Sequence, residues 1–291
     1  MENTPKFGIS CFNYDPSRIE AAAAVSKILS SDKKDLEAIE MAVYKFLGTR
    51  KTAEERRNLE AIAGEKFSEE YLKRIEESSK NTIFTERLDK SQWILFFNEY
   101  PSFERETLDF NREKVEVQYK SYFSIPAPRD AQACIKNAYS LADCIGDFAN
   151  AAEKITIMSD DRITFKIPRN PESAIFYRDN IVAYYQKPDA SKIVEREFGS
   201  ILAKAGLKEG NLARNRGFDF KSKFDYSALN GSHTQLVSRI IADKLSKTDR
   251  PYEPSVLSSI ITRQAEELYS MNPSQIAHLI PREEYLETIT L

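Results

Sequence analysis

The sequence predicts an α+β protein, in which an N-terminal helical domain precedes a mixed or antiparallel sheet layered with helices. Residues 16 to about 100 carry apolar side chains at helical spacing, with few glycines. Residues 115–125 alternate in the manner of a strand, and strand-like and helix-like segments follow them. We therefore expect two domains, a helical one at residues 1–111 and an α+β one at residues 112–291.

The N-terminal helices are predicted from their apolar stripes. These stripes occupy residues 16–29, 34–47 and 67–79. Between the second and third, Thr52-Ala-Glu-Glu resembles the capping box that starts a helix, since a Thr hydroxyl and a Glu carboxylate can satisfy each other's backbone N–H groups. This region shows no motif for chemistry.

The second half is read by the same rules, with β-branched and aromatic residues marking strands. In chain order we predict helix 129–148, strand 162–167, an Asn170-Pro171 turn, strand 180–186, helix 191–205, helix 232–245 and helix 255–270. Gly206 is placed to end a helix, and Ser232 is placed to begin one. Residues 207–230 are polar and contain glycine, which predicts an irregular loop near the functional site.

Composition excludes several classes of protein. The 291 residues include 42 basic and 45 acidic side chains, so no overall charge attracts nucleic acid. The first residues do not show the pattern of a secretory signal peptide, and no run of about 18 apolar residues occurs, so we expect neither a cleaved secretory signal nor a membrane span. Three cysteines and two histidines lack the spacing of a zinc site or a disulfide framework. We expect no metal and no cofactor.

Lys166 is the first candidate for chemistry. In its strand, Phe165 and Ile167 fall on one face and Lys166 falls on the other, because strand side chains alternate. Arg178 precedes the next predicted strand, so two cations are expected close together on a sheet, where they can bind phosphate or move protons. An ordinary solvated lysine on a half-exposed sheet is the alternative.

The order of these residues resembles a known family. Lys120-x-Tyr122-x-Ser124 is followed by Phe165-Lys166, by Tyr177-Arg178-Asp179, and by Ser232-His233 at the start of a helix. This order, over residues 115–246, resembles the Hop-A family of type III effectors of plant-pathogenic bacteria. It is also similar to the lyase proteins of certain lanthipeptide pathways and, more distantly, to phosphothreonine lyase effectors.

The resemblance implies a carbon–oxygen lyase that needs no metal and eliminates phosphate from phosphoserine or phosphothreonine. In that family a lysine acts as the base, and Lys166 matches it. Arg178 matches an arginine that binds the phosphate, and Tyr122 or His233 is available as the proton donor. Lys120 and Arg239 match further cationic positions. Three positions depart from the pattern: Lys120 stands where arginine is more frequent, Ser124 where asparagine is common, and Val237 where an arginine is expected.

Two functions follow from this comparison. The first is an effector-like lyase that acts on a phosphorylated protein or peptide, made in the bacterial cytoplasm and secreted into a host cell. The second, motivated by Val237, is an inactive lyase-like effector that binds a host protein or a secretion chaperone. A third reading, an ADP-ribosyltransferase, would use Glu195-Arg-Glu197, which falls in a helical pattern instead of following a strand.

Simpler roles remain open for the other candidates. Arg178 can pair with Asp179 or Glu172 in a turn, and Tyr122 can pack on the sheet. His233 can interact with its helix N-terminus, and Arg239 can be a solvated charge. Four basic residues of the predicted loop form a cluster that is either solvated or guides an acidic phosphopeptide: Arg214, Arg216, Lys221 and Lys223.

Overall fold

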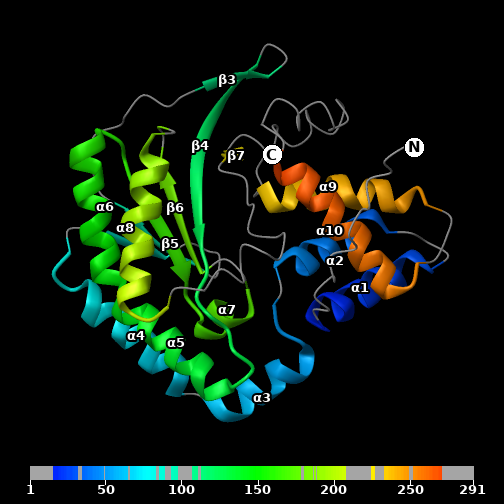
Figure 1. Cartoon of the computed structure of the whole chain (residues 1–291), viewed down its shortest axis with the longest axis horizontal. Helices are drawn as coiled ribbons and strands as arrows, with labels where there is room; N and C mark the ends of the chain where they lie inside the picture. Colours follow the sequence, from blue (N-terminus) through cyan, green and yellow to red (C-terminus); the bar gives the residue numbers. More distant parts are fainter. Residues whose placement is uncertain are drawn as a thin grey trace, which may run out of the picture.

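The computed structural model confirms an α+β fold. It describes residues 16–31, 35–48, 50–64, 66–82, 85–88, 93–97, 107–110, 113–177, 180–185, 187, 189–207, 224–226, 233–248 and 252–270. Within these residues the helices and strands form two packed groups, each with its own apolar core. One group is built around a sheet, and the other is helical (Figure 1).

The sheet runs through the centre of the first group. Its strands are β1 (Thr85–Leu88), β2 (Trp93–Phe97), β3 (Thr107–Phe110), β4 (Glu113–Phe123), β5 (Thr164–Pro168), β6 (Ile181–Tyr185) and β7 (Phe224–Tyr226). The order is β1-β2-β5-β6-β4-β3, with β7 also paired to β4, and every described pair is antiparallel. The sheet is therefore antiparallel, one of the two forms that the sequence predicted.

Helices cover one face of this sheet. They are α4 (Lys66–Ser79), α5 (Ala131–Asp143), α6 (Ile145–Ser159) and α8 (Ala190–Lys204), and they lie on one side of β4, β5 and β6 (Figure 1). Phe165 of β5 lies in this core with its ring centroid 6.1 Å from that of Phe148 and 5.7 Å from that of Phe198. The two shorter helices α3 (Ala53–Ala63) and α7 (Pro171–Phe176) complete the group.

The second group consists of helices from both ends of the described chain. They are α1 (Pro16–Leu29), α2 (Leu36–Gly48), α9 (His233–Ser246) and α10 (Pro254–Ser270). Val43 of α2, Ile241 of α9 and Ile261 of α10 are fully buried in their shared core. This helical unit lies on the opposite side of the sheet from α6 and α8 (Figure 1), and α9 contacts β7.

The two cores divide the chain differently from the boundary expected at residue 111. Strands β1, β2 and β3 precede that boundary and pair within the sheet, while α9 and α10 follow it and pack against α1 and α2. Strands also occupy parts of the region before residue 100 that was predicted to be wholly helical. Trp93-Ile-Leu-Phe-Phe is rich in aromatic and β-branched residues, and its pairing with β5 fixes it as a strand.

Two further local predictions were wrong. The helix expected at residues 129–148 is broken at Cys144, where α5 ends and α6 begins. Asn170-Pro171 begins helix α7 instead of forming a simple turn, because the Asn170 side chain accepts a hydrogen bond from the Glu172 N–H at 2.7 Å and Pro171 is compatible with the first helical position.

The predicted helix ends are confirmed at two places. Thr52 and Glu55 form a reciprocal capping box at the start of α3. After α8, Gly206 adopts a φ of 72°, and the N–H groups of Gly206 and Leu207 donate to the carbonyls of Ala203 and Leu202. This double hydrogen bond is the Schellman arrangement, which favours glycine because its φ is positive.

Candidate functional site

Lys166 lies on the face of the sheet opposite the α4, α5, α6 and α8 core. Along β5, Phe165 and Ile167 are fully buried in that core, whereas Lys166 is half-buried on the other side. This is the orientation that the alternating strand pattern predicted. Lys166 therefore faces the side of the sheet on which the α1, α2, α9 and α10 unit lies (Figure 1).

The strand register brings Tyr122 to the same face as Lys166. Val182 of β6 pairs with Lys166 on β5 and with Tyr122 on β4. Directly opposed residues of antiparallel strands project from the same face, so Lys166 and Tyr122 flank Val182. Two strand spacings separate their Cα atoms by about 10 Å. Val182 between them is itself buried, so Lys166 and Tyr122 flank a covered position on this face.

Two aromatic rings hold the Lys166 ammonium over the sheet. Its Nζ lies 4.6 Å from the ring centroid of Trp93 and 5.6 Å from that of Tyr184. Trp93 is on β2, and Tyr184 is on β6 and buried, so the rings come from the strands on both sides of β5. Aromatic faces attract a cation, and these contacts stabilise the charged amine in this position.

The neighbouring Tyr185 shows how sharply the two faces differ. Its phenol lies in the helix-covered core, where its Oη is 3.1 Å from the Oγ of buried Ser121. Burial raises the pKa of Tyr185 above its ordinary value. Tyr185 is thus part of the core, and Tyr184 is the member of this pair that contacts Lys166.

The helix α9 contributes the remaining described candidate, Arg239. Val237 is fully buried in the helical core, and Arg239 follows it by two residues, or about 200° around the helix. Arg239 is half-buried on the side of α9 that faces away from this core. An arginine at position 237 would instead have to lie among apolar side chains, which explains why valine fits there.

The structure places Lys166 and Tyr122 on one face of the sheet and describes Arg239 on α9, but it describes the other predicted site residues less fully. Lys120 occupies the β4 position paired with Tyr184, and His233 is the first residue of α9, but their side chains lie outside the described part of the molecule. Arg178 and the basic cluster at residues 214–223 are also outside the described residues.

Trp93 is the site residue that the sequence interpretation missed. It was assigned to a helical region, where an aromatic residue signals packing only. The signal that could have identified it is the run of aromatic and apolar residues from Trp93 to Phe97, which is typical of a strand. Its position next to Lys166 additionally required the pairing of β2 with β5.

Other kinds of site can be assessed over the described residues. His, Cys, Asp and Glu side chains in these ranges do not gather in groups of three that could ligate a metal ion. None of the described helices has both the length and the apolar character needed to cross a lipid bilayer. Glu195 and Glu197 lie on α8, so the helix predicted around this pair is confirmed.

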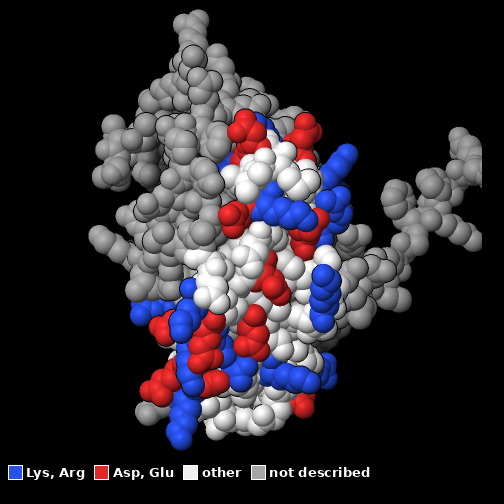
Figure 2. Space-filling view, turned by 90° about the vertical axis from the view of Figure 1, so that its left-hand side faces the viewer, with Lys and Arg blue, Asp and Glu red and all other residues white. Residues whose placement is uncertain are grey.

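Among the described residues, the surface on the side that carries α6 has no patch of one charge that would indicate the charge of a binding partner. Basic and acidic side chains are interspersed there (Figure 2). Exposed ion pairs such as Lys73 with Glu77, 3.8 Å apart, contribute little to stability because water screens them.

Comparison with known proteins identifies no relative. No family model matches the chain, and neither the curated proteins nor the solved structures include a significant match. The effector and lyase family expected from the order of residues stays a prediction.

Proposed function

We propose that this protein is an effector-like lyase that eliminates phosphate from phosphoserine or phosphothreonine in a protein or peptide. The observation that supports the proposal most directly is the shared sheet face of Lys166 and Tyr122 on either side of Val182. A cation and a phenol at this separation can contact the two ends of a phosphorylated side chain. Residues 115–246 also follow the order expected of such a domain.

The proposed reaction is a β-elimination. Lys166 acts in its neutral form, which a neighbouring cation such as Lys120 or Arg178 would favour against the effect of the aromatic rings. Its amine removes the proton from the α-carbon, and the electron pair of that C–H bond forms the carbon–carbon double bond. The bond between the β-carbon and the phosphate oxygen breaks, and Tyr122 or His233 protonates the leaving phosphate. Lys120, Arg178 and Arg239 are the proposed phosphate-binding cations. The products are a dehydroamino acid and inorganic phosphate.

Incubation with a phosphothreonine peptide tests this reaction. The expected result is release of phosphate together with a peptide that has lost the mass of one phosphoric acid. Lys166→Ala should lower the rate at least about 100-fold, because loss of a general base has effects of this size. Lys154→Ala is the matched control, since Lys154 is exposed on α6, and it should keep the full rate. A peptide product containing threonine would mean hydrolysis and would refute the lyase.

A second candidate function is phosphate-directed binding without turnover. Two observations favour it, namely the aromatic rings that stabilise the charged form of Lys166 and the burial of Val237 where a clamp arginine is expected. Such a protein would bind a host protein or a secretion chaperone without modifying it. It predicts that a phosphopeptide binds unchanged and that Lys166→Ala weakens this binding. Equal capture of partners by wild type and Lys166→Ala would instead indicate an interaction surface away from Lys166.

A further inference from the structure

Arg50 lies in the short connection between α2 and α3 and contacts several main-chain carbonyls. Its Nε donates to the carbonyl of Ile175 at 2.8 Å, and its Nη2 donates to that of Ala174 at 2.9 Å. Its Nη1 donates to the carbonyl of Ile125, just after β4, at 2.5 Å. The Arg50 backbone N–H also donates to the carbonyl of Phe176 at 3.0 Å. The last carbonyls of α7 have no hydrogen-bond donor within the helix because no further turn follows. Arg50 supplies the donors for them.

Asn180 completes the same network from the start of β6. Its side-chain amide donates to the carbonyls of Ala174 and Tyr177. Its Oδ1 accepts from the Ile125 N–H at 2.7 Å and from Arg50 Nη2 at 3.3 Å. Asn180 is fully buried, so these bonds are shielded from water. Together Arg50 and Asn180 hold both ends of the connection from α7 to β6, to which Arg178 belongs by sequence.

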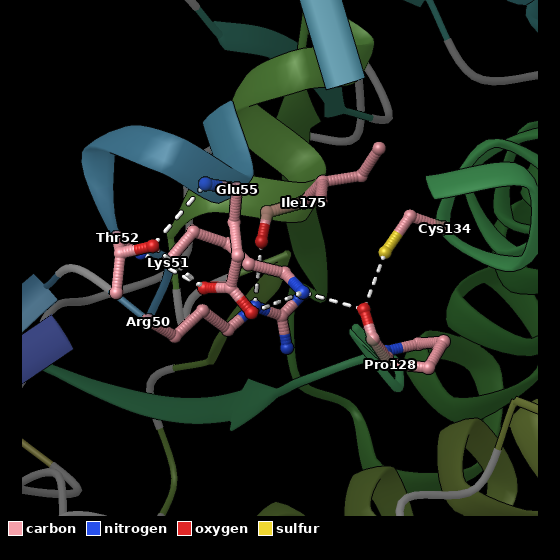
Figure 3. A network of polar contacts seen from close by, with 7 residues as sticks. All are labelled: Arg50, Lys51, Thr52, Glu55, Pro128, Cys134 and Ile175. Carbon is pink, nitrogen blue, oxygen red and sulfur yellow. Dashed lines mark hydrogen bonds and ion pairs between the residues drawn. The ribbon is translucent and has the colours of Figure 1, made fainter. Parts of the chain in front are cut away.

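The residues after Arg50 extend this attachment, as Figure 3 shows. Lys51 is buried, and its Nζ donates to the carbonyl of Pro128 and lies 3.7 Å from the carboxylate of Glu55. At the start of α3, the Ala53 N–H donates to the carboxylate of Glu20 on α1 at 3.1 Å. Residues 50–53 therefore bond the sheet group on one side and the helical unit on the other.

This attachment connects the sheet group to the helix that packs against α9. Arg50 comes two residues after the end of α2, and α2 packs against α9 in the helical core. Arg239 is on α9, whereas Lys166 and Tyr122 are on the sheet that Arg50 bonds through Ile125 and Asn180. The residues around Arg50 and the contact of α9 with β7 are therefore among the connections between the two sets of candidate residues.

We propose that Arg50 is a positioning residue that holds α1, α2, α9 and α10 in one orientation against the face of the sheet that carries Lys166. Arg50 is the suited residue type because its planar guanidinium directs several N–H donors in fixed directions, which a lysine ammonium cannot do. The orientation is a property of the fold, and only its effect on phosphopeptides rests on the function proposed above.

Spin-label distance measurements test the orientation directly. Nitroxides are attached at Lys154→Cys on α6 and Lys244→Cys on α9, two exposed positions, in a Cys11→Ser background. The native Cys134 and Cys144 are buried and remain unlabelled. The otherwise wild-type protein should give one narrow distance distribution. Arg50→Ala should broaden or shift it, and Arg50→Lys should have a smaller effect in the same direction.

A control variant separates orientation from general loss of stability. Val194→Ala removes buried volume from the sheet core without touching the Arg50 network, so it should lower the melting temperature and keep the narrow distribution. An unchanged distribution in Arg50→Ala would overturn the proposal. If Arg50→Ala does not fold, Arg50→Lys replaces it in the comparison, and an unchanged distribution in that variant overturns the proposal equally.

Titration with a phosphothreonine peptide provides the functional arm. If the proposed function is correct, Arg50→Lys should weaken peptide binding at least several-fold, while Val194→Ala should not. The two proposals can fail separately. If Arg50→Lys changes the distance distribution but neither Lys166→Ala nor Arg50→Lys changes the affinity for the peptide, the phosphate-directed function is refuted. The orienting role of Arg50 is then still supported.

Discussion

Substitution of Gly146 by alanine is the sharpest test of how α4 packs against α6. Gly146 lies in the first turn of α6, and its N–H donates to the Ser78 Oγ at 2.8 Å. That hydroxyl in turn donates to the carbonyl of Asp143 at 2.8 Å. A Cβ added to Gly146 would lie 2.2 Å from the main-chain oxygen of Ser78, much closer than van der Waals contact allows. The end of α4 would have to move.

The expected loss of stability follows from these contacts. Overpacking a rigid contact costs about 1–3 kcal/mol, and each of the two Ser78 hydrogen bonds contributes about 0.5–1.5 kcal/mol. Alanine recovers about 1 kcal/mol of helix propensity relative to glycine. The net effect is a decrease of about 3 kcal/mol in the free energy of unfolding, within a range of roughly 1–5 kcal/mol.

Gly199 provides the matched control for this substitution. It also lies within a helix, α8, but a Cβ added there meets no atom within 4 Å. Gly199→Ala should therefore increase the free energy of unfolding by about 0.5–1 kcal/mol. Urea denaturation followed by circular dichroism measures both variants. A Gly146→Ala protein as stable as the wild type would refute the packing described between α4 and α6.

Three further predictions concern local features. Thr52→Ala should lower the free energy of unfolding by about 0.5–2 kcal/mol because it removes the capping box with Glu55, and an unchanged urea midpoint would contradict this. Gly206→Ala should cost about 1 kcal/mol in the same assay, since its φ is 72°. Burial raises the pKa of the Cys144 thiol to about 11, so the folded state retains this proton more tightly than the unfolded state. Stability should consequently fall as pH rises from about 9 to 11, and it should fall less in Cys144→Ala, measured by urea denaturation across that range.

Local patterns were sufficient for most of the helices and for the central strands. The apolar stripe at residues 16–29 predicted α1, and alternation around Phe165 and Ile167 predicted β5 together with the outward position of Lys166. Thr52 and Gly206 predicted helix ends because side-chain capping and a positive φ are decided within a few residues. Such features depend on the backbone conformation of neighbouring residues, which the sequence specifies directly.

Other features depended on partners that are distant in the sequence. The apolar stripe around Cys144 continues from α5 into α6, so periodicity alone gave no break, and the break accompanies the close approach of Ser78 to Gly146. The apolar run at residues 93–97 is compatible with a helix or with a buried strand, and the pairing of β2 with β5 makes it a strand. The sequence likewise contained no local signal for the bonds of Arg50.

The sequence by itself determined which face of each segment is apolar, and hence that Lys166 stands on the other face of its strand. Only the tertiary structure decided what lies beside it. Tyr122 reaches the same surface because β6 lies between β4 and β5, and Trp93 reaches it because β2 pairs with β5. An apolar periodicity predicts that one face of a segment is buried. It does not predict which other segment packs against that face, because apolar contacts are not directional.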